Sequence, residues 1–212
     1  MLEVGFGLGL NALLTCDLAI EKNTELNFHS LEKGASICTL IQEIDYSPHL
    51  RNGVMVKTLQ GALKPIADCL VEGCLSGVES GTGTGTGAPI ASEYGVDTNK
   101  SNSSISLKTP VKISFTPTVT LHIHWNNAVT DPLPSVLFDA VYQDAFSPDN
   151  NPECWTSEFF SKIRSAMNPE AKMSTYCAKG SVRRSLLTSD FLVTKLAGPP
   201  GKREMMVATP NR

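Results

Sequence analysis

A short strand that runs directly into three alternating glycines is the feature that most restricts the fold of this chain. Leu2–Val4 is followed by Gly5, Gly7 and Gly9, and a helical pattern then covers Leu10–Ile20. Glycine lets the backbone turn tightly and approach a ligand closely, and the first turn of a helix presents unpaired N–H groups. The pattern therefore predicts a strand-turn-helix unit that binds a ligand.

The spacing of the glycines indicates which class of ligand the turn binds. Dinucleotide-binding turns have the pattern G-x-G-x-x-G, whereas this chain has G-x-G-x-G. The difference favours S-adenosylmethionine, which has a nucleoside and an amino-acid tail but no pyrophosphate, over NAD. We predict that this ligand is held by the strand end, the glycines and the helix start, namely Glu3, Gly5, Gly7, Gly9 and Asn11. A glycine-rich turn of this kind also occurs as a plain structural corner.

A second strand ends in another acidic residue. Leu26–Glu32 completes a β-α-β unit that begins at Glu3. Nucleoside-binding folds place a carboxylate at this position because it accepts hydrogen bonds from both ribose hydroxyls. Glu32 is the candidate ribose ligand, and Lys33 directly follows it. A carboxylate that only caps the following turn would give the same pattern, so position alone leaves both interpretations open.

Apolar and polar segments continue to alternate along the chain. We expect helices over 35–44, 60–71 and 180–190, and a turn followed by a helix over 152–168. Strands are expected over 119–125, 139–144 and 173–178, with a final antiparallel strand pair over 191–196 and 204–209. This order predicts a single Rossmann-like α/β domain over 1–212, with a mostly parallel twisted sheet and helices on both faces. Residues 77–116 are rich in Gly, Thr and Ser, so we expect a flexible, low-complexity insertion there.

The most specific signal lies in the second half of the chain. Asp139-Ala140 and Asp144-Ala145-Phe146-Ser147-Pro148 precede Asn151-Pro152 and Trp155. Further blocks follow at 174–178, 180–184 and 201–205. Together they resemble the class I methyltransferase family that completes 5-methylaminomethyl-2-thiouridine at the wobble position of bacterial tRNA.

The resemblance implies S-adenosylmethionine as methyl donor and the exocyclic amine of 5-aminomethyl-2-thiouridine as acceptor. Asp144 is then the residue that orients the amine and takes its proton directly or through water. The bound wobble base would be contacted by Phe146, Ser147, Trp155 and Tyr176, because single-stranded bases commonly stack on aromatic side chains. Core or loop packing is the alternative for the aromatic residues.

Three departures from the family pattern stand out. Family members carry several tens of residues before the glycine motif, so the chain is expected to be an N-terminally truncated form or to have a misassigned start. Asn127 stands where the family has an acidic residue, and its carbonyl oxygen would accept a weaker hydrogen bond from the adenine amino group. The third departure is the insertion.

Charge is divided unevenly. Residues 1–161 carry 8 basic and 18 acidic residues, whereas residues 162–212 carry 10 and 3. A basic surface can neutralise phosphates, and the family resemblance implies that tRNA, contacted in its anticodon region, meets the C-terminal quarter. The candidates are Arg183, Arg184, Lys202 and Arg203, with Lys179 and Lys195 nearby. Solvated surface charges are the alternative.

The remaining signals favour a cytoplasmic protein. No apolar run is long enough for a membrane span. The six cysteines form no C-x-x-C pair, and His122 and His124 lack a third ligand, so we expect no metal site. Family relatives are often fused to a flavin-dependent oxidoreductase that prepares the substrate, which here would be a separate protein. A methyltransferase with a small-molecule or protein acceptor, and a non-catalytic RNA- or partner-binding relative, remain alternative functions.

Overall fold

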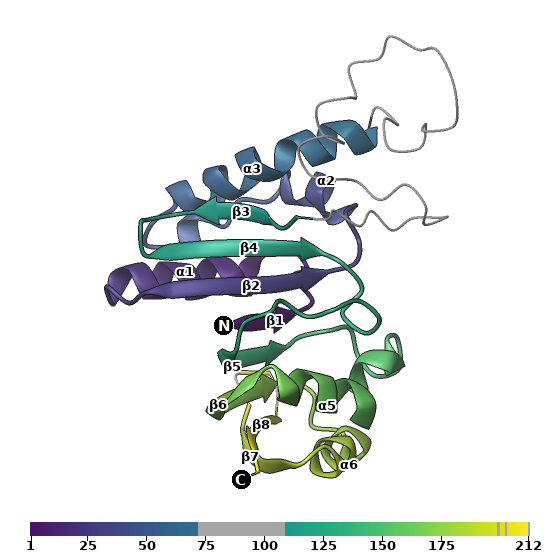
Figure 1. The fold of residues 1–212 in the computed structure, drawn as a ribbon. Coiled ribbons are helices and arrows are strands. Elements are labelled where there is room, and N and C mark those ends of the chain that lie inside the picture. The colour runs from purple at the N-terminus through teal and green to yellow at the C-terminus, as the bar shows by residue number, and fades with distance from the viewer. Residues whose placement is uncertain (72–108, 199, 202, 212) are drawn as a thin grey trace, which may run out of the picture. The chain divides into compact units, whose positions relative to one another are not determined.

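The computed structural model describes residues 1–71, 109–198, 200–201 and 203–211. Most of the expected insertion, residues 77–108, lies outside this part of the chain. The described residues form two compact units. Unit 1 comprises residues 1–5 and 127–212, and unit 2 comprises residues 6–126 (Figure 1). Among the described residues, no helix is long and apolar enough to cross a membrane.

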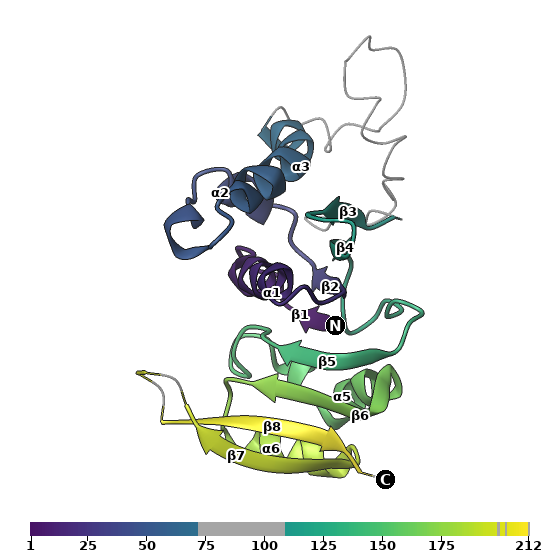
Figure 2. The same cartoon turned by 90° about the vertical axis from the view of Figure 1, so that its left-hand side faces the viewer.

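Unit 2 is a small sheet covered by helices on one face. Its strands are β2 (Leu26–Glu32), β3 (Val111–Ser114) and β4 (Val119–Trp125), and its helices are α1 (Leu10–Glu21), α2 (Ile37–Ile41), the 3-10 turn η1 (Ser47–His49) and α3 (Val54–Val71). β4 pairs with β2 in parallel and with β3 in antiparallel fashion. Figure 2 shows the three α-helices on the same side of these strands.

The core of unit 2 follows from strand alternation. Leu121, Ile123 and Trp125 in β4 are fully buried, whereas the intervening His122 and His124 are partly exposed. The register places His29 of β2 opposite His122. Successive side chains of a strand point to opposite faces, so the apolar residues face the helices and the histidines occupy the other face of the sheet.

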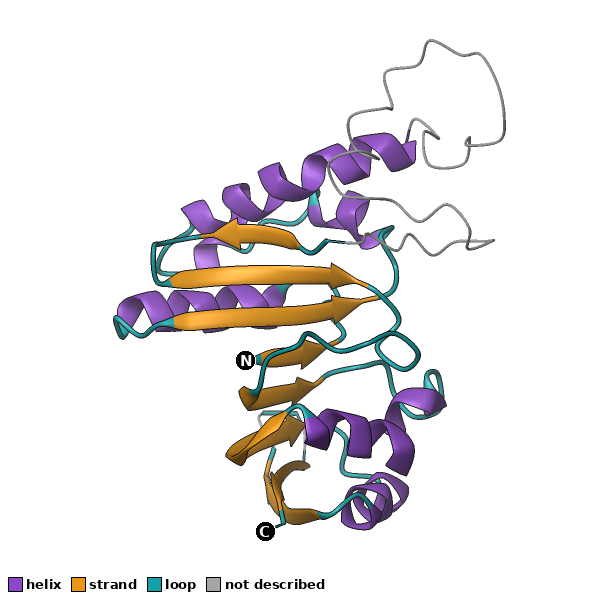
Figure 3. Ribbon diagram, viewed as in Figure 1, coloured by secondary structure: helices purple, strands orange, loops and turns teal. Residues whose placement is uncertain are grey.

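Unit 1 contains the N-terminal strand and the whole C-terminal part of the chain. Its strands lie next to one another in the order β1 (Leu2–Val4), β5 (Phe138–Gln143), β6 (Met167–Thr175), β8 (Glu204–Pro210) and β7 (Phe191–Ala197). The helical segments are η2 (Pro152–Trp155), α5 (Ser157–Ser165) and α6 (Gly180–Thr188). The pairs β1–β5 and β5–β6 are parallel, and β6–β8 and β7–β8 are antiparallel (Figure 3).

The predicted elements are confirmed, with one additional strand and several differences in extent. α2 is shorter than the expected 35–44, and the helix expected to reach residue 168 ends at Ser165. β3 occupies residues 111–114, which the sequence assigned to the insertion, because four residues give too short an alternation to recognise. α3 begins at Val54 and β6 at Met167, each several residues earlier than expected. Thr156 starts α5 as expected for an N-cap, with its hydroxyl accepting the N–H of Phe159.

Candidate functional site: a glycine turn and an acidic strand end

The glycine turn has the backbone geometry that its sequence predicts. Gly5, Gly7 and Gly9 have φ values of +93°, +53° and +81°, all in the left-handed region that disfavours other residues. Gly9 also precedes α1, where no side chain caps the first turn. The described structure has no atom within 4 Å of the position that a Cβ of Gly7 would occupy. Open space beside uncapped N–H groups is suited to an anionic or polar ligand.

Glu32 is joined to this turn within unit 2. One carboxylate oxygen accepts the N–H of Gly7 at 3.2 Å, and the other accepts the N–H groups of Lys33 and Gly34, each at 2.9 Å. The two interpretations of Glu32, as a ribose ligand and as a cap of its own turn, are therefore compatible. Glu32 does cap its own turn, and its second oxygen also lies at the glycine turn. Burial and then the Glu32 carboxylate raise the pKa of the nearby Cys38 thiol to about 12, so Cys38 stays protonated.

Asn127 closes a tight turn after β4. Its side-chain Oδ1 accepts the N–H of Val129 at 3.0 Å, while its own N–H donates to Asp131 Oδ2 at 2.9 Å. The N–H of Asp131 returns to the Asn127 carbonyl at 2.8 Å. The oxygen expected to contact adenine already accepts one hydrogen bond, and one lone pair of this oxygen remains for a ligand.

The carboxyl end of β5 carries the candidate catalytic residue. Asp144 is exposed, and its backbone N–H donates to the Val4 carbonyl at 3.0 Å. The Asp144 carbonyl oxygen would lie 2.8 Å from a Cβ on Gly5, so the close approach of these two segments requires glycine there. Glu3, in the same unit, is fully buried.

Two aromatic side chains hold the loop that follows Asp144. Trp155 Nε1 donates to the Phe146 carbonyl at 2.8 Å, and the Tyr176 hydroxyl donates to the Ala145 carbonyl at 2.9 Å. Trp155 is only 4% exposed and packs edge-on against Tyr176 and Phe160. Phe146, by contrast, is 77% exposed. The burial of Trp155 does not support its expected stacking on a base, and the core-packing alternative explains its position better.

The remaining loop residues have ordinary structural roles. The Ser147 carbonyl accepts the N–H groups of Asn150 and Asn151 and so closes the turn before η2. Burial and then the neighbouring Cys177 and Asp144 raise the pKa of Tyr176, so its hydroxyl remains a donor. The hydrogen bonds of Trp155 and Tyr176 were not predictable from the sequence, because each joins the loop after β5 to a residue outside that loop.

The basic residues of unit 1 differ in their surroundings. Arg183 and Arg184 lie exposed on α6, and Arg203 is also exposed. Lys179 forms an ion pair with Asp149, and Lys195 forms one with Glu204 at 2.7 Å. Lys202 lies outside the described residues. The two arginines of α6 are therefore better candidates for phosphate contacts than the paired lysines.

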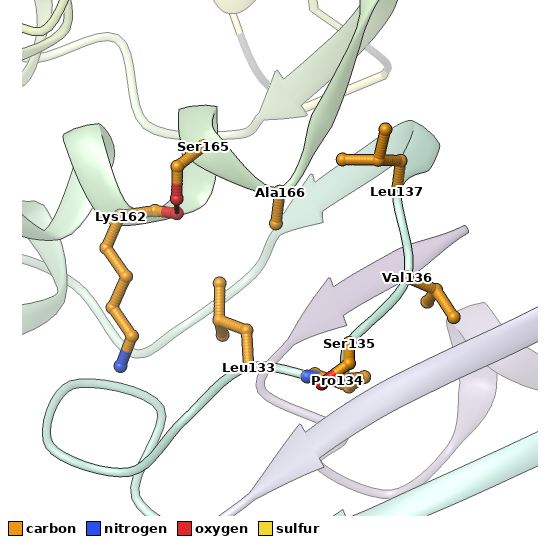
Figure 4. Close-up of a pocket in the computed structure, with 8 residues that line it drawn as sticks. All are labelled: Leu133, Pro134, Ser135, Val136, Leu137, Lys162, Ser165 and Ala166. Carbon is orange, nitrogen blue, oxygen red and sulfur yellow. Dashed lines mark hydrogen bonds between the residues drawn. The ribbon is translucent and has the colours of Figure 1, made fainter.

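A shallow pocket of about 390 Å³ lies elsewhere in unit 1. Residues 133–137 line one side and α5 lines the other, through Lys162 and Ser165, with Ala166 directly after the helix (Figure 4). None of the predicted site residues lines this pocket. Among the described residues, no group of three or more His, Cys, Asp or Glu side chains could hold a metal ion.

The order and pairing of the strands, together with the glycine turn, define a Rossmann-like class I methyltransferase fold. The crystal structure of MNMC2 from Aquifex aeolicus superposes on 98% of this chain and 52% of its own, with a TM-score of 0.56 and 24% identity. The glycopeptide N-methyltransferase MtfA complexed with S-adenosyl-L-homocysteine gives a TM-score of 0.50 at 10% identity, over 100% of this chain and 80% of its own. At these identities, the likeness concerns the fold.

The chain belongs to a family of S-adenosyl-L-methionine-dependent methyltransferases, whose model matches residues 98–211, more than half of its length. S-adenosylmethionine is accordingly its cofactor. The tRNA 5-methylaminomethyl-2-thiouridine biosynthesis bifunctional protein MnmC of Aeromonas hydrophila is 38% identical over 88 residues, and that of Nitrosospira multiformis is 43% identical over 79 residues. These matches cover 39% and 37% of this chain and 13% of each relative. They confirm that the methyltransferase is MnmC-like.

Proposed function

We propose that this chain methylates the exocyclic amine of 5-aminomethyl-2-thiouridine at the wobble position of tRNA. The observation that carries the proposal is the loop after β5. There an exposed carboxylate, Asp144, is followed by Phe146, whose backbone is held by Trp155 while its ring remains exposed. A carboxylate beside an exposed aromatic ring is suited to an amine carried on a splayed base. The names of the MnmC relatives support the same acceptor.

The residues of unit 2 fit the cofactor. Gly7 leaves open space, the α1 N-terminus lacks a side-chain cap, and Glu32 presents carboxylate oxygens beside Gly7. We assign the ribose to Glu32 and the amino-acid tail to the turn formed by Gly5, Gly7 and Gly9 with Asn11. Lys33 and Glu3 complete the predicted set, and Asn127 is assigned to the adenine amino group. When bound, S-adenosylmethionine supplies a methyl group attached to a positively charged sulfur.

Asp144 is assigned to the amine that accepts the methyl group. The attacking amine must be neutral, and its nitrogen gains a positive charge as the N–C bond forms, so a carboxylate both orients it and removes its proton. Positioning the two reactants accounts for most of the expected acceleration. Phe146 stacks on the base, and Arg183, Arg184, Lys202 and Arg203 contact phosphates near the anticodon. A flavin-dependent oxidoreductase would supply the aminomethyl substrate.

The proposal is tested by two measurements on the same chain. Calorimetric titration with S-adenosylmethionine should show binding, and transfer of a labelled methyl group should occur to tRNA from a strain that accumulates the unmethylated amine. Asp144→Asn should abolish transfer and leave cofactor affinity within about twofold. Asp139→Asn, at the opposite end of the same strand, is the matched control and should retain transfer.

Each result has a distinct meaning. Cofactor binding with transfer to other acceptors but none to tRNA would favour a small-molecule or protein substrate. Absence of cofactor binding would favour a non-catalytic RNA- or partner-binding relative. Full transfer by Asp144→Asn would remove Asp144 from its assigned role while leaving the acceptor assignment intact.

A further inference from the structure

Lys162 binds a set of backbone carbonyl groups that belong to a loop far from it in sequence. Its ammonium group donates to the carbonyls of Ala128, Val129 and Asp131 at 2.7, 2.9 and 2.6 Å. An ammonium has three N–H donors, so these bonds use its full capacity. Figure 4 shows the side chain extended from α5 with its nitrogen directed away from the helix.

The bound carbonyls belong to the turn that begins at Asn127. That turn is closed by the hydrogen bonds of Asn127 with Val129 and Asp131 described above. Its carbonyls converge on one point, where their partial negative charges would repel one another without a cation. Burial, partly offset by the charge of Asp131, lowers the pKa of Lys162. The hydrogen bonds to the three carbonyls favour the charged form of the amine.

We propose that Lys162 is a positioning residue that holds the Asn127 turn in the conformation that recognises the adenine ring of the cofactor. The proposal rests on the assignment of Asn127 to adenine under the proposed function. The hydrogen bonds of Lys162 go to backbone carbonyls of the turn, so it acts through Asn127. An amide oxygen accepts a hydrogen bond from the 6-amino group of adenine but not from the 6-oxo group of hypoxanthine.

The test compares binding of S-adenosylhomocysteine with binding of its S-inosyl analogue by calorimetry. Lys162→Met removes the three donors and retains most of the side-chain volume. Without the charge-assisted hydrogen bonds that hold the turn, the variant should lose roughly tenfold or more in affinity for the adenosyl ligand. The preference for adenosyl over inosyl ligand should fall with it. Lys172→Met, an exposed lysine in the same unit, should change neither value.

A double-variant comparison separates positioning from general destabilisation. Asn127→Ala should lose the same preference, and combining it with Lys162→Met should cause little further loss, because both changes remove one interaction. Methylammonium added to Lys162→Ala should restore part of the preference. Thermal unfolding should first show that Lys162→Ala is folded. The rescue then tests the proposal even if Lys162→Met does not fold.

Several outcomes would overturn the inference. An unchanged ligand preference in Lys162→Met would show that the turn needs no ammonium, and additive losses with Asn127→Ala would show that the two residues act separately. If the unaltered chain bound neither ligand, the proposed function itself would fail. If it bound both equally, Asn127 would lose its assignment to adenine.

Discussion

The glycines of the turn are required for two different physical reasons. Gly5 has a left-handed φ and also lies against the Asp144 backbone, where a Cβ would be 2.8 Å from the carbonyl oxygen. Gly7 has a left-handed φ but open space around its missing side chain. A steric contact therefore excludes larger residues at position 5. At position 7, glycine is favoured by the backbone conformation and by the space that it leaves for a ligand.

Alanine substitutions should separate these reasons. Gly7→Ala should reduce the free energy of unfolding by about 1–2 kcal/mol, the cost of a left-handed alanine. Gly5→Ala should cost more, because the backbone must also move. Urea unfolding gives both values, and calorimetry should show that Gly7→Ala also weakens cofactor binding. A larger stability loss for Gly7→Ala than for Gly5→Ala would contradict this reasoning.

The exposed ring of Phe146 gives a second residue-level prediction. Stacking of an aromatic side chain on a base contributes about 1–3 kcal/mol, so Phe146→Ala should weaken tRNA binding by roughly 5- to 150-fold. Stability and cofactor affinity should stay unchanged, because the ring is 77% exposed. Leu192→Ala, a change at another exposed apolar residue, is the control. Equal tRNA affinity for both variants would argue against stacking.

The sequence indicated the cofactor better than the contacts of individual side chains. The glycine spacing and the strand-end carboxylates indicated the cofactor correctly, since both depend on local backbone geometry. The roles of Trp155 and Tyr176 were not predictable. Their side chains donate hydrogen bonds to carbonyls of the loop after β5, and only the folded chain brings them next to that loop. The same applies to Lys162, which looks like an ordinary helix-surface lysine in the sequence.

At the scale of elements, β2 and β4 carry a cluster of three histidines. His29 Nδ1 lies 3.0 Å from His124 Nε2, and the His29 ring stacks on His122 with centroids 4.4 Å apart. Burial, followed by the neighbouring histidines, lowers the pKa of His29 to about 3. Burial and then His122 lower that of His124 to about 4. Protonation is thus disfavoured in the folded protein.

This cluster should make stability depend on pH. In the unfolded chain, histidine takes up a proton near pH 6.5, whereas the folded cluster does not until much lower pH. The unfolded state therefore binds more protons below pH 6.5, and stability should fall as the pH decreases from 6.5 toward 4. His29→Gln should make this dependence shallower in urea unfolding. His49→Gln, at an exposed histidine, should leave it unchanged.

The elements show where sequence patterns are sufficient. β2 and β4 have the predicted bounds, because each alternates clearly over seven residues. β3 was missed because its four residues follow a long polar segment, and pairing with β4 rather than local pattern defines it. The early start of α3 was also missed, since Val54 is exposed and adds nothing to the apolar spacing.

For the whole molecule, the main feature is the uneven distribution of charge, with the basic residues concentrated in the C-terminal quarter. Arg183 and Arg184 are exposed in the basic C-terminal quarter, and neutralising both should reduce the number of counterions displaced from tRNA. Replacing both by Gln should weaken tRNA binding and lower the slope of log K against log salt by about 1.5–2. Filter binding at several salt concentrations measures this slope. The pair Lys22→Gln and Lys64→Gln is the control, and an equal effect there would indicate a nonspecific charge effect.

The pairing of β1 with β5 has a consequence for synthesis on the ribosome. Leu2 is aligned with Val141, so β1 cannot pair with this neighbour until β5 has also left the ribosomal exit tunnel. At translation rates of about 5–20 residues per second, that delay is roughly 7–28 s. During this time the apolar Leu2 and Val4 lack their final partner strand. The nascent chain therefore exposes an apolar strand for that period, and exposed apolar strands are the kind of surface that general chaperones bind.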